Sequence, residues 1–194
     1  RESLVRGKKA GLRMISFGIE TGNDEGLKYL KKGTKTGKMR EVFKWCRELG
    51  VLSDANYIIG LPFEKTEEDI VKSVAFLKSL DPDYTLINIL MLLPNTELFK
   101  DAVDKGLDSW ERWTDFCLNP SPDFRIGYWT EHFTVNELVA IHKRMVRSFY
   151  FRPSYVLRNV FATRSIYEFK AKVSGFIKLL DLDISPLRDN KFSE

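Results

Sequence analysis

The amino-acid sequence predicts an α/β protein: about three parallel βα units that form part of a (β/α) barrel, followed by a helical C-terminal region. Three apolar runs end at glycine or proline near positions 18, 60 and 94, and helical periodicity follows each. This spacing is close to the ~31 residues of one barrel unit. Right-handed crossovers would make the strands parallel. We expect the barrel units in residues 1–106, and an aromatic-rich connector with a helical tail in residues 107–194.

The first unit begins with the end of an amphipathic helix over residues 1–10, which a glycine closes. Because the chain starts with arginine, we expect its natural start to lie upstream. The first strand, residues 12–18, is almost continuously apolar, as in a parallel strand covered on both faces. A short helix over residues 24–32 follows, then a second helix that Thr36 caps and Gly50 ends.

The second and third units repeat this order. A strand over residues 52–59 precedes a helix over residues 67–80, which Thr66 caps and a following proline stops. The third strand covers residues 84–93 and is rich in β-branched and aliphatic side chains. A helix over residues 97–105 completes this part of the chain.

Beyond the third unit the composition changes, because seven aromatic residues fall between positions 110 and 133. Such a run favours an irregular packed cap, and an aromatic wall of a substrate site is the alternative. Residues 134–137 have the pattern of a capping box that opens a long helix. The apolar stripe of that helix consists of Leu138, Ile141, Met145 and Phe149. Pro153 begins a further helix, and another is expected over residues 165–180.

The composition fits a folded soluble protein, with 43% hydrophobic and 30% charged residues. The longest apolar stretch, residues 86–94, is far shorter than the ~18 residues of a membrane helix. Cys46 and Cys117 have a spacing that suits neither a disulfide framework nor a metal knuckle, and Cys46 falls on an apolar helix stripe. We therefore expect a cytoplasmic protein from a reducing compartment.

Three motifs follow the three predicted strands. They read Gly18-Ile19-Glu20-Thr21-Gly22, Ile58-Ile59-Gly60-Leu61-Pro62-Phe63-Glu64 and Leu93-Pro94-Asn95-Thr96-Glu97-Leu98. In the first two, a glycine closes an apolar run and a carboxylate follows, as at sites on the carboxyl ends of parallel strands. In this order the motifs resemble the second half of a radical S-adenosylmethionine (SAM) core. The segments 82–84 and 150–153 resemble the branch of that superfamily with an N-terminal cobalamin-binding domain.

The resemblance implies a parent enzyme that uses SAM, a 4Fe-4S cluster and cobalamin, and that cleaves SAM to a 5'-deoxyadenosyl radical. In this superfamily a CxxxCxxC loop supplies three cysteine ligands to the cluster. This chain contains no such loop, and clustered thiolates are what the cluster needs. We therefore expect this chain to be an inactive fragment of an iron-sulfur oxidoreductase or transferase, with no cofactor bound and no catalytic or metal-ligating residue.

The same resemblance implies cofactor-binding roles for Glu20, Thr21, Lys32, Asn56, Ile58 and Gly60. Glu20, beside Thr21, has the place of a strand-end residue that contacts the ribose or methionine part of SAM. Lys32 has the place of a basic residue that reaches the methionine carboxylate. Asn56 matches a residue that bonds the ribose, and the strand end at Ile58 and Gly60 is expected to lie against adenine. Carboxylates and amides suit hydroxyls, a cation suits a carboxylate, and an apolar ledge suits a purine.

Other interpretations of these residues stay open. Lys32 lies in a lysine-rich turn and can be a surface lysine, and Asn56 can be a strand asparagine satisfied by the protein. Glu64 is expected to order the turn before Thr66 rather than to contact a ligand. Phe63 stands where the family pattern has glycine, so it can narrow the mouth of the pocket.

Two other function classes remain as alternatives. One is a non-catalytic binding or assembly module from a degenerate relative. The other is a fragment of a tRNA-modifying radical SAM enzyme, since residues 134–180 contain nine basic and two acidic residues. We expect a small-molecule substrate of unknown identity rather than nucleic acid. We also expect self-association, because a partial barrel leaves a strand edge and an apolar sheet face open.

Overall fold

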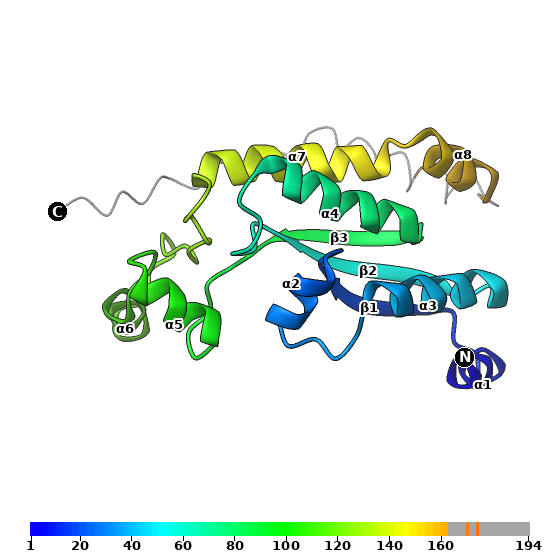
Figure 1. Cartoon of the computed structure of the whole chain (residues 1–194), viewed down its shortest axis with the longest axis horizontal. Helices are drawn as coiled ribbons and strands as arrows, with labels where there is room; N and C mark the ends of the chain where they lie inside the picture. The colour runs from blue at the N-terminus through cyan, green and yellow to red at the C-terminus, as the bar shows by residue number, and fades with distance from the viewer. Residues whose placement is uncertain (163–169, 171–173, 175–194) are drawn as a thin grey trace. The chain divides into compact units, whose positions relative to one another are not determined.

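The computed structural model describes residues 1–162 together with residues 170 and 174 (Figure 1). The chain forms two compact units, Arg1–Thr134 and Val135–Glu194. The first unit holds a sheet of three parallel strands in the order β1 (Met14–Glu20), β2 (Leu52–Ile59) and β3 (Tyr84–Ile89). Helices follow each strand. The prediction of an α/β fold with three parallel βα units and a helical C-terminal region is confirmed.

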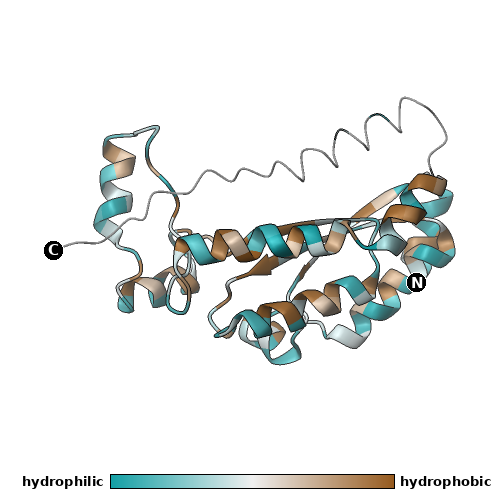
Figure 2. Cartoon of the chain, turned by 90° about the horizontal axis from the view of Figure 1, so that it is seen from above, coloured by the Kyte–Doolittle hydropathy of each residue, from teal (hydrophilic) through white to brown (hydrophobic). Residues whose placement is uncertain are grey.

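Two helices pack on the sheet and contact each other: α3 (Thr36–Leu49) and α4 (Glu67–Leu80). Helix α1 (Glu2–Lys9) in turn contacts α3. The helices are amphipathic, and Figure 2 shows hydrophobic and hydrophilic residues alternating along them. The buried side chains of α3 and α4 include Phe43, Cys46, Ile70, Val74 and Leu77. One core of the unit therefore lies between the sheet and these two helices, and a second buried cluster includes Leu92, Phe99 and Trp129.

The strands bury alternate residues, so that the sheet has one covered and one open face. In β2, Ala55 and Tyr57 are buried, whereas Asn56 between them is partly exposed. In β1, Met14 remains 51% exposed, so the expectation that the first strand is covered on both faces is wrong. An apolar run alone predicts a strand, but what covers each face depends on the surrounding elements.

Three strand boundaries differ from the prediction, and the first is the start of β1, which lies at Met14 rather than at residue 12. Strand β1 continues to Glu20 because its pairing with β2 shifts register at a bulge between Gly18 and Glu20. Strand β3 ends at Ile89 rather than at residue 93. Beyond it, Met91 forms an isolated bridge to Tyr128, so this segment pairs with the connector instead of continuing the sheet.

The helix ends follow local signals with one exception. Thr66 caps α4 in a capping box with Asp69, and Gly50 ends α3 in the left-handed conformation (φ +61°). Thr36 is not the N-cap of α3 but its first residue, and Lys35 precedes it without a side-chain cap. The Thr36 amide instead donates to Asp24 Oδ1 (2.8 Å), at the start of α2 (Asp24–Tyr29).

The predicted helix that completes the third unit is α5 (Glu97–Asp104), and the connector after it contains a helix, α6 (Trp110–Leu118), so it is more regular than expected. Its aromatic residues pack on one another, with Phe116 and Phe124 stacked at 4.0 Å between ring centroids. Trp113 meets Phe124 edge-on at 5.0 Å. The aromatic residues thus pack as expected for a cap, although Trp110 remains 39% exposed and packs on Phe99 of α5.

The second unit contains α7 (Val135–Tyr150) and α8 (Pro153–Ala162). The predicted apolar stripe of α7 is buried, and Pro153 begins α8 as expected. The helix expected over residues 165–180 lies outside the described residues, apart from residues 170 and 174. In the part of the chain that the structure describes, no helix is long and apolar enough to cross a membrane.

Candidate functional site

Glu20 and Lys32, predicted as site residues from separate positions, form an ion pair at the carboxyl end of β1. Lys32 Nζ lies 2.7 Å from Glu20 Oε1. The Glu20 side chain is 18% exposed and that of Lys32 is 37% exposed. The pair is thus half-sheltered and still open to a ligand from solvent.

Backbone geometry holds both members of this pair. Glu20 follows the bulge and has a positive φ of 63°, a conformation that few non-glycine residues adopt. The Lys32 amide donates to the carbonyl of Leu27 (2.9 Å), and Lys31 before it also has a positive φ of 55°. Two unusual backbone conformations therefore accompany the pair, as is common at functional sites.

Asn56 lies on the open face of the sheet, opposite Gly18 in the β1–β2 register. Its Nδ2 donates to Ser16 Oγ (3.0 Å), and Ser16 Oγ donates to Asp54 Oδ2 (2.7 Å). A row of polar side chains thus crosses from β2 to β1. Ser16 and Asp54 were missed in the sequence, although Asp54 stands two positions before Asn56 on the same strand.

Ile58 continues the same face of β2 as Asn56 and is partly exposed. Gly60 follows directly after β2 and has a positive φ of 74°, which a glycine adopts without strain. Four predicted site residues therefore lie on the open face of the sheet or at the carboxyl end of its strands: Glu20, Lys32, Asn56 and Ile58. Their roles toward a cofactor stay predictions.

Thr21 is turned away from this group. It is fully buried, and its Oγ1 lies 3.2 Å from Ser73 Oγ of α4. The Gly22 amide donates to the same Ser73 oxygen (3.3 Å), and the Tyr57 hydroxyl donates to the Ser73 carbonyl (2.7 Å). The structure thus places Thr21 in a buried polar cluster on the helix side of the sheet. Ser73 could have been found as a polar residue within the apolar stripe of α4.

Glu64 is buried, with only 2% of its surface exposed. Its Oε2 accepts a hydrogen bond from the Leu61 amide (3.1 Å), so the expectation that Glu64 orders this turn is confirmed. Burial raises the pKa of its carboxyl to about 7, and donation from the Leu61 amide, together with the nearby Gly60 amide and Ser73 hydroxyl, opposes this shift in part. Glu64 therefore changes charge near neutral pH.

Phe63 does not stand over the polar row. Its ring lies against the backbone of Gly26, where a Cβ would come within 2.5 Å of the ring, and meets Tyr29 edge-on at 5.8 Å. The side chain is thus held by α2. Phe63 stands where the family pattern has glycine, and Gly26 on the facing helix α2 leaves room for its ring.

The described residues contain no group of three or more His, Cys, Asp or Glu side chains that could hold a metal ion. Cys46 is buried on α3, and burial raises the pKa of its thiol. Cys117 is exposed on α6, in the aromatic connector.

Comparison with known proteins gave several relatives, and no family model matches the chain. An uncharacterized methyltransferase of Pyrococcus horikoshii is 25% identical over 89% of this chain and 36% of its own length. A putative methylthiotransferase of Methanocaldococcus jannaschii is 33% identical over 50% of this chain and 21% of its own length. The anaerobic magnesium-protoporphyrin IX monomethyl ester cyclase of a Synechocystis species is 30% identical over 39% of this chain and 15% of its own length.

This chain spans about a third or less of the length of these relatives. A solved structure, coproporphyrinogen III oxidase of Escherichia coli, which is described as a radical SAM enzyme, is 16% identical. The match covers 75% of this chain and 35% of that one, with a TM-score of 0.47. The sequence relatives confirm the resemblance to the radical SAM superfamily.

Proposed function

We propose that this chain is part of a radical SAM enzyme and supplies one wall of its SAM-binding site. The observation that carries this proposal is the Glu20–Lys32 ion pair, 2.7 Å long, at the carboxyl end of β1. An amino-acid zwitterion such as the methionine part of SAM needs an acceptor for its ammonium and a cation for its carboxylate. Glu20 and Lys32 are such a pair of groups, placed side by side.

In this proposal each residue of the wall has a stated task. Lys32 exchanges its contact with Glu20 for the carboxylate of SAM, and Glu20 accepts from the ammonium or a ribose hydroxyl. The Asn56 amide, held by Ser16 at 3.0 Å, bonds the ribose, and Ile58 with Gly60 lies against adenine. When bound, SAM supplies the sulfonium whose cleavage is the common chemistry of the superfamily. Because each charge already has a partner, neither is left unpaired before SAM binds.

The two cysteines do not fit an iron-sulfur cluster. Cys46 is buried in the core and Cys117 is exposed on another helix, whereas a cluster needs several thiolates at one place. We propose that the cluster ligands belong to a part of the parent protein outside this chain. The chain alone, reconstituted with iron and sulfide, is expected to bind no stoichiometric cluster and to leave SAM intact. A cluster absorption band that disappears on substitution of either cysteine would contradict this.

We further propose that the parent carries a cobalamin-binding domain. This rests on the resemblance of residues 82–84 and 150–153 to that branch of the superfamily. Within this chain Asp83 accepts from the backbone amide of Ser53 (2.8 Å) and so ties the start of β2 to the start of β3. Asp83 thus has a structural role in the sheet, and we do not propose that it contacts cobalamin.

The proposal is tested by SAM binding to the parent protein, measured by isothermal titration calorimetry. Glu20→Gln keeps the shape of the side chain and removes its charge, so SAM affinity should fall. The matched control is Glu97→Gln, because Glu97, the first residue of α5, pairs at 2.6 Å with Lys31, the neighbour of Lys32, but lies outside the wall. Equal affinity for wild type and Glu20→Gln, or an equal loss in Glu97→Gln, would overturn the proposal.

A further inference from the structure

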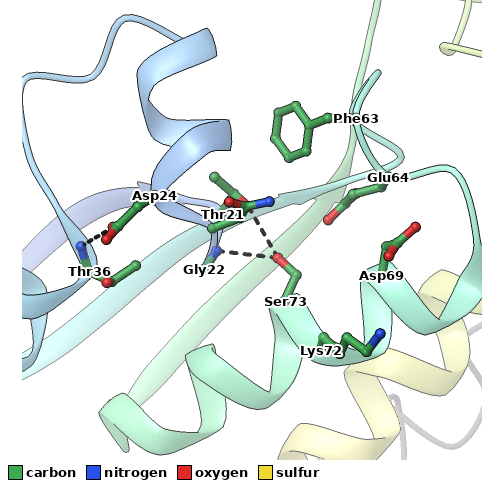
Figure 3. A pocket seen from close by; sticks show the side chains of 10 residues that line it. Thr21, Gly22, Asp24, Thr36, Phe63, Glu64, Asp69, Lys72 and Ser73 are labelled. Carbon is green, nitrogen blue, oxygen red and sulfur yellow. Dashed lines mark hydrogen bonds between the residues drawn. The ribbon is translucent and has the colours of Figure 1, made fainter.

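A cavity of about 370 Å³ opens on the helix side of the sheet (Figure 3). Its walls come from the residues after β1, the start of α3, the turn before α4 and the first turns of α4. Neither Glu20 nor Lys32 lines it. The cavity is thus distinct from the proposed SAM wall, and a ligand bound in it would not need SAM to be present.

One side chain in this cavity has a hydrogen-bonding atom without a partner. Glu64 Oε2 is held by the Leu61 amide, but Glu64 Oε1 is buried and accepts no hydrogen bond. In Figure 3 the Glu64 side chain points from the turn toward the space above Ser73. A buried carboxylate oxygen without a donor is costly. Among the described residues no donor lies within hydrogen-bond distance of this oxygen, so it can accept a hydrogen bond from a ligand.

The charges around the cavity favour a cation as that donor. Asp24 and Asp69 also line it, and hydrogen bonds from Thr36 and Thr66 hold the pKa values of these two carboxyls low, so both are ionised. Among the described lining residues, Lys72 alone is basic, and its Nζ lies 4.0 Å from Glu68 outside the cavity. Negative groups thus outnumber positive ones.

The remaining walls define the kind of cation. Thr21 offers a hydroxyl oxygen, which suits a cation with N–H donors, whereas Ser73 Oγ is already bonded to Thr21, Gly22 and Tyr57. Phe63 offers an apolar ring, which suits a carbon chain or the face-on approach of a cation. A metal ion fits less well, because no group of three ligating side chains is placed for one among the described residues.

We propose that this cavity binds a small organic primary amine as its ammonium ion. One N–H donates to Glu64 Oε1, the others donate to hydroxyl or carboxylate oxygens of the wall, and the carbon chain lies against Phe63. The volume is sufficient for an amine of a few carbon atoms. The positive charge of Lys72, at the edge of the cavity, repels the ammonium ion and lowers its affinity for the cavity.

The test is a titration of the full chain with n-propylammonium chloride above pH 7, where Glu64 is ionised, followed by nuclear magnetic resonance. Saturable shifts of the Glu64 side-chain carboxyl and the Gly22 amide are expected. Tetramethylammonium chloride has the same charge but no N–H donor, and potassium chloride controls for ionic strength. Neither should reproduce the saturable shifts. Equal shifts with tetramethylammonium, or shifts that never saturate, would overturn the proposal.

Two variants and a control test the assignment of residues. Glu64→Gln should weaken propylammonium at least about tenfold, because a charged hydrogen bond is lost. Lys72→Met, at a side chain that is 75% exposed, should strengthen binding and does not threaten the fold. Glu97→Gln removes a carboxylate outside the cavity and should leave the affinity unchanged. Undiminished binding in Glu64→Gln, or unchanged binding in Lys72→Met, would each contradict the proposed site.

Discussion

The carboxylate of Glu20 lies across the backbone of Gly18. A Cβ at residue 18 would stand 2.5 Å from Glu20 Oε1 and 3.3 Å from Lys32 Nζ. The bulge between the two residues and the positive φ of Glu20 fold the side chain back over the strand. The ion pair with Lys32 therefore depends on a glycine at position 18 as much as on its two charged members.

Gly18→Ala is expected to displace the Glu20 carboxylate and weaken SAM binding by the parent protein. The clashing atom is the end of a flexible side chain, so the free energy of unfolding should change by less than about 1 kcal/mol. Calorimetric SAM titration and thermal unfolding measure the two effects. Gly33→Ala is the matched control, because a Cβ there meets no atom within 4 Å. Wild-type SAM affinity in Gly18→Ala would contradict the prediction.

Glu20→Ala is expected to weaken SAM binding more than Lys32→Ala does. Glu20 is held at the end of a strand, whereas Lys32 has a longer and more exposed side chain that loses more entropy on binding. A charged hydrogen bond of this kind is worth roughly 1.5–3 kcal/mol. Binding titrations on both variants of the parent protein give the order, and the reverse order would show Lys32 to be the principal contact.

Glu64 should make the stability of this chain fall as the pH rises toward neutrality. Its carboxyl has a pKa of about 7 when folded and an ordinary value of 4.5 when unfolded, so the folded state binds more protons between these values. The contribution is fully present below pH 4.5 and is lost as the pH rises through about 7. At roughly 1.4 kcal/mol for each pH unit, this amounts to about 3 kcal/mol.

Urea unfolding on both sides of this pH range checks the prediction. Glu64→Gln cannot ionise, so the variant should lack this part of the decline and gain stability relative to wild type as the pH rises. Asp24→Asn is a suitable comparison, since the pKa of Asp24 is lowered rather than raised and its pH dependence has the opposite sign. An unchanged pH profile in Glu64→Gln would show that folding does not raise the pKa of Glu64.

The chain is expected to self-associate at micromolar concentration. Strand β1 pairs with β2 on one side only, and no other described strand pairs with its outer edge. The open face also carries exposed Met14, Tyr84 and Leu86. Light scattering should give a dimer or larger species, and Met14→Lys should shift it toward monomer because charge blunts an open edge. A 22.6 kDa monomer at all concentrations would contradict this.

Local patterns in the sequence were sufficient for much of the fold. The bounds of β2 and α4, the Thr66 cap and the end of α3 at Gly50 were all predicted, because each depends on residues within a few positions of one another. The prediction that Thr36 caps α3 was wrong. Asp24, twelve residues earlier in the chain, accepts the hydrogen bond of the Thr36 amide, and Thr36 is the first residue of the helix. That contact depends on how α2 is placed, which periodicity does not encode.

Some features of the site likewise follow from local sequence, and others follow only from the tertiary structure. The sequence by itself determined three parallel βα units and a glycine-bounded carboxylate at the end of the first strand, since hydrophobic periodicity and glycine positions are local properties. Only the tertiary structure decided that Glu20 meets Lys32, that Thr21 turns to Ser73 on the other side of the sheet, and that one oxygen of Glu64 is buried without a donor. Each of these depends on a one-residue bulge or on the packing of segments distant in the chain. A shift of one residue in a strand exchanges its two faces, and burial depends on the neighbours that folding brings together.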